Sequence, residues 1–200
     1  MAGLKRCLPL VCLVCLVSAP GLQAVDLPGA GQFGAQAALV FPASPDLRLT
    51  AGSPGLSLGL HGTWAFAPGH ELRPRVDVVA FPGRNQTTSG PVTPQSLDTR
   101  VRSLALGADY LRRLDDRWAV GVGIQELRWS VASTNRVTPT PGAAPVSVSG
   151  TAHWWRLGLG PVLTCRLSRH LEAEVRATFS RYGQENQPAN AASCGLLWRF

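Results

Sequence analysis

Charged residues that alternate with other residues are the groups in this chain best suited to chemistry. Nine of them share one face of their segments: Arg73, Arg75, Asp77, Asp109, Arg156, Glu172, Glu174, Arg176 and Arg199. Alternation with a period of two is typical of β-strands, because successive side chains point to opposite sides. We expect these five arginines and four carboxylates to pair with one another across neighbouring strands.

The residues that catalysis would need do not converge in the sequence. Glu172 and Glu174 share a face, and paired carboxylates can do acid–base work, but arginine neighbours are expected to hold both ionised. His61 and His153 have no nearby serine and acid in a tight cluster, which a nucleophile and its base require. We predict no enzyme, no catalytic residue, no metal site and no cofactor.

Composition favours an exported protein, and its length allows one domain or at most two small ones. The 200 residues are 45% hydrophobic with a mean hydropathy of only +0.07, which excludes a helical membrane protein. Met1–Ala24 has a basic start, an apolar core at Cys7–Val17 and a small-residue exit, and we predict a signal peptide cleaved after Ala24. Residues 25–31 form a short lead-in. Export argues against a nucleic-acid partner despite the net charge of +7.

Eight alternating segments follow, and each is close to the roughly 9–11 tilted residues that a membrane-crossing strand needs. They are Gln32–Phe41, Gly55–Ala67, Glu71–Pro82, Leu97–Arg112, Arg117–Val131, Thr151–Arg166, His170–Tyr182 and Ala192–Phe200. One face of each segment is apolar. Long connections (Pro42–Pro54, Gly83–Ser96, Ala132–Gly150) alternate with tight ones (Pro68–His70, Arg113–Asp116, Leu167–Arg169), as in transmembrane barrels.

The sequence therefore predicts an all-β fold, an eight-stranded antiparallel up-and-down transmembrane β-barrel over residues 32–200. Apolar faces point outward and the charges point into the lumen. Eight strands leave a lumen about wide enough for its own side chains, so we expect a salt-bridged plug. The alternative is a narrow ion or proton path along the same residues.

The 14 aromatic residues fall at the two ends of these strands and none lies midway. At the tight-turn end are Phe33, Trp64, Phe66, Tyr110, Trp118, Trp198 and Phe200. At the long-loop end are Phe41, Phe81, Trp129, Trp154, Trp155, Phe179 and Tyr182. Aromatic rings prefer lipid–water boundaries, so we predict two aromatic girdles. Trp129 and Trp154 have inward parity, which a bulge or a position above the bilayer would explain.

Two cysteines, Cys165 and Cys194, remain after removal of the predicted signal peptide. Both have outward parity, and one strand lies between them, with the two residues at different heights. That separation exceeds what a disulfide tolerates, so we predict two unpaired thiols.

The strand count, the loop alternation and the terminal Leu-Trp-Arg-Phe resemble the small eight-stranded outer-membrane barrels of the OmpA/OmpX type. The resemblance covers Gln32–Phe200. It implies a place in the bacterial outer membrane, and it implies that Leu196, Trp198 and Phe200 form the signal read by the barrel-assembly machinery. Pro161 departs from the pattern, because proline removes a ladder donor and a closed barrel has no edge.

We expect a monomer with a structural or surface-interaction role, in envelope integrity or in adhesion through Gly83–Ser96 and Ala132–Gly150. Four arginines suit the phosphates of outer-membrane lipopolysaccharide: Arg84, Arg100, Arg102 and Arg136. A porin-like channel, a lipid-modifying enzyme using His61 and His153, and a soluble lipid-binding barrel are the alternatives. The charged inner face argues against the last, which needs an apolar lumen.

Overall fold

The computed structural model describes residues 31–89, 94–139, 143–182 and 187–200. The predicted signal peptide and residues 25–30 of the predicted lead-in lie outside these ranges. In chain order the elements are β1 (Gln32–Pro42), α2 (Pro45–Ala51), β2 (Gly55–Ala67), β3 (His70–Ala80), β4 (Arg84–Ser89), β5 (Pro94–Arg113), β6 (Trp118–Val137), β7 (Val146–Arg166), β8 (Leu171–Thr178), β9 (Arg181–Tyr182), β10 (Gln187–Pro188) and β11 (Ala191–Arg199).

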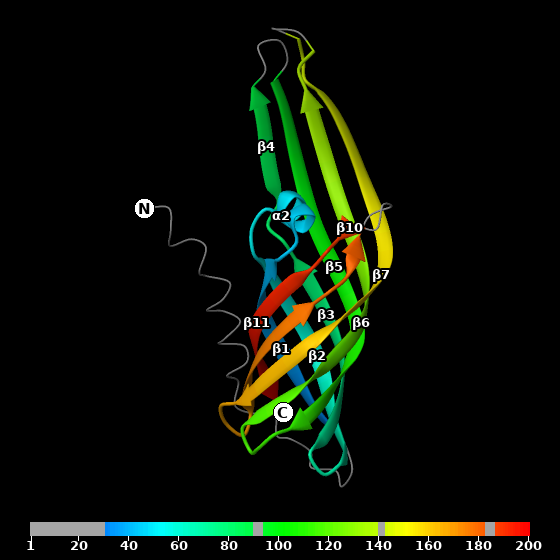
Figure 1. The fold of residues 1–200 in the computed structure, drawn as a ribbon. Coiled ribbons are helices and arrows are strands. Elements are labelled where there is room, and N and C mark those ends of the chain that lie inside the picture. The colour runs from blue at the N-terminus through cyan, green and yellow to red at the C-terminus, as the bar shows by residue number, and fades with distance from the viewer. Residues whose placement is uncertain (1–30, 90–93, 140–142, 183–186) are drawn as a thin grey trace, which may run out of the picture.

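Eight strands close into a ring, and Figure 1 shows the barrel that they form from the side. The order around the ring is β1, β2, β3, β5, β6, β7, β8 and β11, and β11 pairs back with β1. Each of the pairings around the ring is antiparallel. The predicted fold class is confirmed, and at the tight-turn end each strand boundary agrees with its prediction to within one residue.

The barrel wall exposes apolar side chains and buries charged ones, which is the reverse of the arrangement in a soluble domain. Outward residues such as Leu60 (61% exposed) and Ile124 (54%) are apolar and uncovered, whereas Arg73 and Asp109 are fully buried inside. Alternation along each strand produces both faces at once, because neighbouring side chains point in opposite directions. The side of each ribbon that faces the lumen is therefore the one that carries the charges.

The tight turns lie together at one end, here called the turn end. Gly69 adopts a positive φ of 73° between β2 and β3, a conformation that favours glycine. Between β5 and β6 the carboxylate of Asp115 accepts the backbone N–H groups of Arg117 and Trp118, both at 2.7 Å. These two hydrogen bonds lower the pKa of Asp115 and hold the turn.

At the opposite, loop end, β5, β6 and β7 continue beyond the ring. They have 20, 20 and 21 residues, and β4 pairs with the first part of β5. The result is a four-stranded sheet that continues well beyond the rim of the barrel, as Figure 1 shows. The described residues of the predicted loops Gly83–Ser96 and Ala132–Gly150 are therefore largely strand, and that part of the prediction was wrong.

The predicted loop Pro42–Pro54 contains the helix α2. Ser44 is its N-cap residue, Pro45 begins it, and Gly52 ends it at a φ of 79°. The Ser44 hydroxyl donates to the Pro188 carbonyl at 2.8 Å, so the helix is tied to the last outer connection. Within the described residues α2 is the only helix, and it is too short and too polar to cross a membrane.

Pro161 lies within β7 without shifting the register. The β7–β8 ladder runs from Val162 to Arg166 and resumes at a bridge between Leu159 and Phe179, which continues the same alignment. Leu159 and Phe179 exchange both backbone hydrogen bonds, so Pro161 occupies the next position that would donate toward β8. The missing N–H explains why the ladder is interrupted there.

The two cysteines of the barrel are unpaired, as predicted. Cys165 is half-buried on β7 and Cys194 is exposed on β11, and β8 lies between the two strands. The closed strand order therefore keeps the two thiols apart.

Candidate functional site: a lumen filled in two layers

Ion pairs occupy the half of the lumen nearer the turn end, beside a small buried apolar cluster of Leu111, Ala119 and Val162. Glu172 lies at the centre of the ion pairs, accepts a hydrogen bond from the Arg73 guanidinium at 2.8 Å and forms an ion pair with Arg199. Arg113, on β5, also pairs with Glu71 and reaches within 3.9 Å of Glu172. These groups come from four strands, and register alone brings them to one level of the barrel.

A second cluster lies nearer the middle of the lumen. Arg75 donates to Asp77 at 2.6 Å, to Glu174 at 3.0 Å and to Asp109 at 3.2 Å. Arg176 also pairs with Asp109 and Glu174. Arg73 reaches Glu174 at 3.5 Å and so joins the two clusters into one network.

Apart from Arg166 at the rim, the network balances its charge. Five carboxylates (Glu71, Asp77, Asp109, Glu172 and Glu174) meet five arginines (Arg73, Arg75, Arg113, Arg176 and Arg199), and Arg166 lies 3.9 Å from Glu172 at the rim. A buried charge without a partner costs several kcal/mol, so pairing is what permits these groups inside the barrel.

Two glycines on the inner wall provide the space that these long side chains need. A Cβ atom on Gly123 would collide with Nη1 of Arg176 and with Oδ1 of Asp109. A Cβ atom on Gly59 would collide with Oδ1 of Asp77. Small residues on the wall are therefore part of the ionic layer, since they permit charged side chains from other strands to lie across them.

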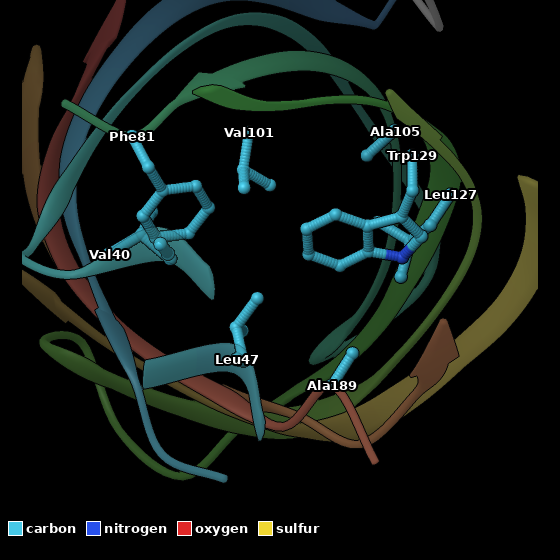
Figure 2. Close-up of a cluster of buried hydrophobic side chains, with 9 residues drawn as sticks. Val40, Leu47, Phe81, Val101, Ala105, Leu127, Trp129 and Ala189 are labelled. Atoms are coloured by element: carbon cyan, nitrogen blue, oxygen red, sulfur yellow. The ribbon is translucent and has the colours of Figure 1, made fainter. Parts of the chain in front are cut away.

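Apolar side chains fill the half of the lumen nearer the loop end. They are buried together in one cluster: Val40, Leu47, Ala51, Phe81, Val101, Ala105, Leu127, Trp129 and Ala189. Figure 2 shows Phe81, Leu47 and Trp129 converging from different sides of the ring. Leu47 is fully buried and comes from α2, so the helix supplies part of the plug.

A cavity of about 60 Å³ lies between the two layers. Arg75, Asp77 and Arg176 line it from the ionic layer, and Phe81 and Trp129 line it from the apolar layer. It is large enough for a few water molecules. The described part of the chain has no group of three or more His, Cys, Asp or Glu side chains placed to hold a metal ion.

The sequence-predicted lumen residues other than Arg156 lie within the ion-pair network. Arg156 is half-exposed on β7 and lies opposite Leu127, at the level of the apolar layer. Its Nη1 donates to the backbone carbonyl of Trp155 at 2.8 Å. Glu71 and Arg113 belong to the network but were absent from the prediction. Glu71 lies two residues before Arg73 and has the same inward parity, so it could have been predicted from the sequence.

Eight of the predicted girdle residues lie exposed on the outer wall. Phe33, Trp64, Phe66, Tyr110 and Trp118 are near the turn end, and Phe41, Trp155 and Phe179 are near the loop end. Phe81 was predicted wrongly: it has the inward parity of Arg75 and Asp77, and its side chain packs inside the lumen. The side chain of Tyr182 lies outside the described residues. At the turn end Trp198 stacks on His170, with ring centroids 6.1 Å apart.

Trp129 and Trp154 have inward parity without a bulge. The β6–β7 register is continuous, with Trp129 directly opposite Trp154. Trp129 is buried in the apolar layer, and Trp154 is half-buried against it. The inward parity of these two residues was therefore the sequence signal for an apolar plug, a feature that was not predicted.

The histidines considered for catalysis lie on opposite sides of the wall. His61 is buried inside the barrel, whereas His153 is exposed on the outer face of the rising part of β7. A Cβ atom on Gly34 would lie 2.5 Å from Nε2 of His61, so the imidazole occupies space left by that glycine. The structure does not bring the two imidazoles together.

No family model matches the chain, and no curated protein matches it in sequence. Solved structures resemble it in architecture. The attachment invasion locus protein Ail of Yersinia pestis is 11% identical, with 86% of this chain and 97% of that chain covered and a TM-score of 0.39. Neisserial surface protein A is 13% identical, with 85% and 97% covered and a TM-score of 0.40. A major outer membrane protein from Thermus thermophilus is 13% identical, with 86% and 100% covered and a TM-score of 0.49.

Identities and scores this low carry no information about ligands or activity. The class of the protein follows from its own strands: eight of them close an antiparallel ring with an apolar exterior and a charged interior. That is the architecture of a transmembrane β-barrel.

Proposed function

We propose that this chain is a bacterial outer-membrane protein with a structural and surface-interaction role, and that it has no enzymatic activity. The turn end would face the periplasm and the loop end the exterior, as the lengths of the connections favour. The single observation that carries the proposal is the combination of a lumen filled in two layers with a sheet that rises above one rim. Such a molecule offers its outside, rather than its inside, to partners.

The rising sheet has two open edges that suit an extracellular ligand. From Val146 to Leu157 the edge of β7 that faces away from β6 pairs with no described strand. The outer edge of β4 is likewise unpaired among the described residues. Open backbone N–H and C=O groups can accept an added strand from a partner. Between Val146 and Ala152 the β7 edge carries no charge that would discourage pairing.

One substitution tests this edge without disturbing the barrel. Leu159 donates toward β8, so the N–H of Ser149, ten residues earlier with the same parity, points to the open edge. Ser149→Pro removes that donor and leaves the β6–β7 ladder intact. Proteoliposomes carrying the natural chain are expected to retain fluorescent strand-forming peptides rich in Val and Thr. Ser149→Pro should lose most of this binding, and Ser149→Thr should keep it.

The last strand supports the proposed contact with the barrel-assembly machinery. Leu196 is exposed on the outer wall, and Trp198 and Phe200 follow at alternate positions. Phe200→Ser is expected to lower the amount of chain in the outer-membrane fraction, since the alternating residues Leu196, Trp198 and Phe200 would be the recognised element. Phe179→Ser, which also removes an exposed aromatic, should have a much smaller effect on assembly.

A narrow channel is the second candidate, and the continuous ion-pair network is the observation that favours it. Single-channel recording in planar bilayers separates the two functions. The plugged barrel is expected to be silent, because both layers would have to move before an ion could pass. Heat-modifiable gel migration of the outer-membrane fraction tests membrane insertion itself. A steady conductance from folded chain would replace our proposal with the channel.

A further inference from the structure

The outward face of β5, β6 and β7 changes its chemistry toward the loop end. Near the middle of the wall it exposes Leu106, Ile124 and Leu157. Further along the same face come Arg102 and Arg100 on β5 and Arg128 on β6, all exposed. Hydrocarbon-facing residues are thus followed by a group of guanidinium side chains at the level where a bilayer would end.

Register places these arginines next to one another. Arg102 is directly opposite Ser130, and Arg128 is two residues away from Ser130 on the same face of β6. Diagonal neighbours of this kind have Cα atoms about 7–8 Å apart, within reach of long side chains. Arg100 is the next outward residue on β5. The three arginines, here called the outer arginine cluster, therefore span a patch of the size of a small anionic head group.

The positive charge of the outer arginine cluster is largely unpaired. No described residue forms an ion pair with Arg102 or Arg128, and Arg100 meets only the exposed Asp98, at 3.5 Å. Arg128 lies over the Trp155 ring, with its central carbon 5.7 Å from the ring centroid. Such stacking orients the guanidinium group and leaves its edge free to donate hydrogen bonds. The acidic residues on the same face are Asp98 above and Glu126 below, and Glu126 lies between Leu106 and Leu157 in the register.

A hollow of about 330 Å³ adjoins the cluster on the same face of the rising sheet. Its walls are polar and come from three strands: Asn85, Ser96, Asp98, Arg100, Thr134 and Arg136. Hydroxyl, amide and guanidinium groups at such a site can hydrogen-bond to the hydroxyl groups of sugars. Along the direction of the strands, the apolar wall is thus followed by the outer arginine cluster and then by the polar hollow.

We propose that the outer arginine cluster binds the phosphate groups of a phosphorylated glycolipid. Its acyl chains would lie along Leu106, Ile124 and Leu157, and its sugars would occupy the hollow. Guanidinium groups match phosphate oxygens with paired, charge-assisted hydrogen bonds. The inference rests on the proposed membrane location and adds the chemical class of the lipid and the residues that recognise it. Arg84, considered with these arginines from the sequence, instead donates to the Leu49 carbonyl at 2.7 Å and holds α2.

The test compares two sets of three arginines at opposite rims. Arg100→Gln, Arg102→Gln and Arg128→Gln are combined in one variant. Arg112→Gln, Arg117→Gln and Arg169→Gln, exposed at the turn end, are combined in the control. Binding of bisphosphorylated lipid A, of its dephosphorylated form and of phosphatidylglycerol is titrated with the full chain in detergent. We expect the cluster variant to bind bisphosphorylated lipid A at least about tenfold more weakly, with the control within about twofold of the natural chain.

Three results would overturn the proposal. They are equal binding of the phosphorylated and dephosphorylated lipids by the natural chain, an equal loss in both variants, and binding of phosphatidylglycerol as tight as that of bisphosphorylated lipid A. Heat-modifiable migration of every sample shows separately whether the barrel has folded. Weak binding by a folded variant therefore reports on the outer arginine cluster. Absence of the natural chain from the outer-membrane fraction would instead contradict the proposed membrane location.

Discussion

The two layers of the lumen occupy one cylinder but are built in different ways. In the layer nearer the turn end, charged groups such as Arg73 and Glu172 come from barrel strands, and pairing across the ring brings them together. In the layer nearer the loop end, Leu47 comes from a helix inserted between two strands. The first layer depends on strand register and on full pairing of its charges. The second depends on a connection folding back over the mouth of the ring.

The largest expected effect is in the ionic layer. Glu172→Ala leaves Arg73 and Arg199 buried without their main partner, and we expect it to lower the free energy of unfolding by about 3–5 kcal/mol. Urea unfolding of the refolded barrel measures this value. Asp98→Ala, which breaks an exposed ion pair, is the control and should cost less than about 1 kcal/mol. Equal costs for the two variants would mean that the network does not stabilise the barrel.

A somewhat smaller effect is expected in the apolar layer. Leu47 is fully buried, and Leu47→Ala should cost about 2–4 kcal/mol through lost packing and the space left behind. Leu49, on the same helix, is 61% exposed, so Leu49→Ala should change little. Limited proteolysis of residues 43–54 should accelerate only in Leu47→Ala. Faster cleavage in both variants would show that the helix is not anchored by its buried side chain.

The wall beside the ionic layer can be tested through glycine. Gly123→Val places new atoms against Arg176 and Asp109, and we expect it to lower the free energy of unfolding by about 1–3 kcal/mol. Gly150 has open space around it, so Gly150→Val should have an effect of no more than about 0.5 kcal/mol. The difference between the two urea midpoints measures how tightly the charged side chains press on the wall.

The smallest effect is expected where the paired lower part of β7 meets its open upper part. Pro161→Ala restores a backbone donor facing β8, and we expect a gain of up to about 1 kcal/mol in the free energy of unfolding. Hydrogen exchange should show the new amide protected, because its partner strand keeps the same register on both sides of Pro161. An unprotected amide there would indicate that the two strands separate below the bridge at Leu159.

Much of the barrel was predictable because its signal is local. Alternation along β2 indicated both its boundaries, Gly55 and Ala67, and the face that each residue occupies. Most of the ionic layer was found in the same way. The prediction failed for Phe81, which was assigned to an outer girdle although it shares the inward parity of Arg75 and Asp77. It also failed for α2, although Ser44, Pro45 and Gly52 are ordinary signals of a short helix.

The sequence by itself determined which side of each strand is apolar and which is charged, because a period of two is a property of neighbouring residues. Only the tertiary structure decided which charges meet. Arg73 and Glu172 are 99 residues apart and face one another through ring closure and register, which depend on every strand together. The same holds for the plug, since the burial of Leu47 depends on where its loop can return over the closed ring.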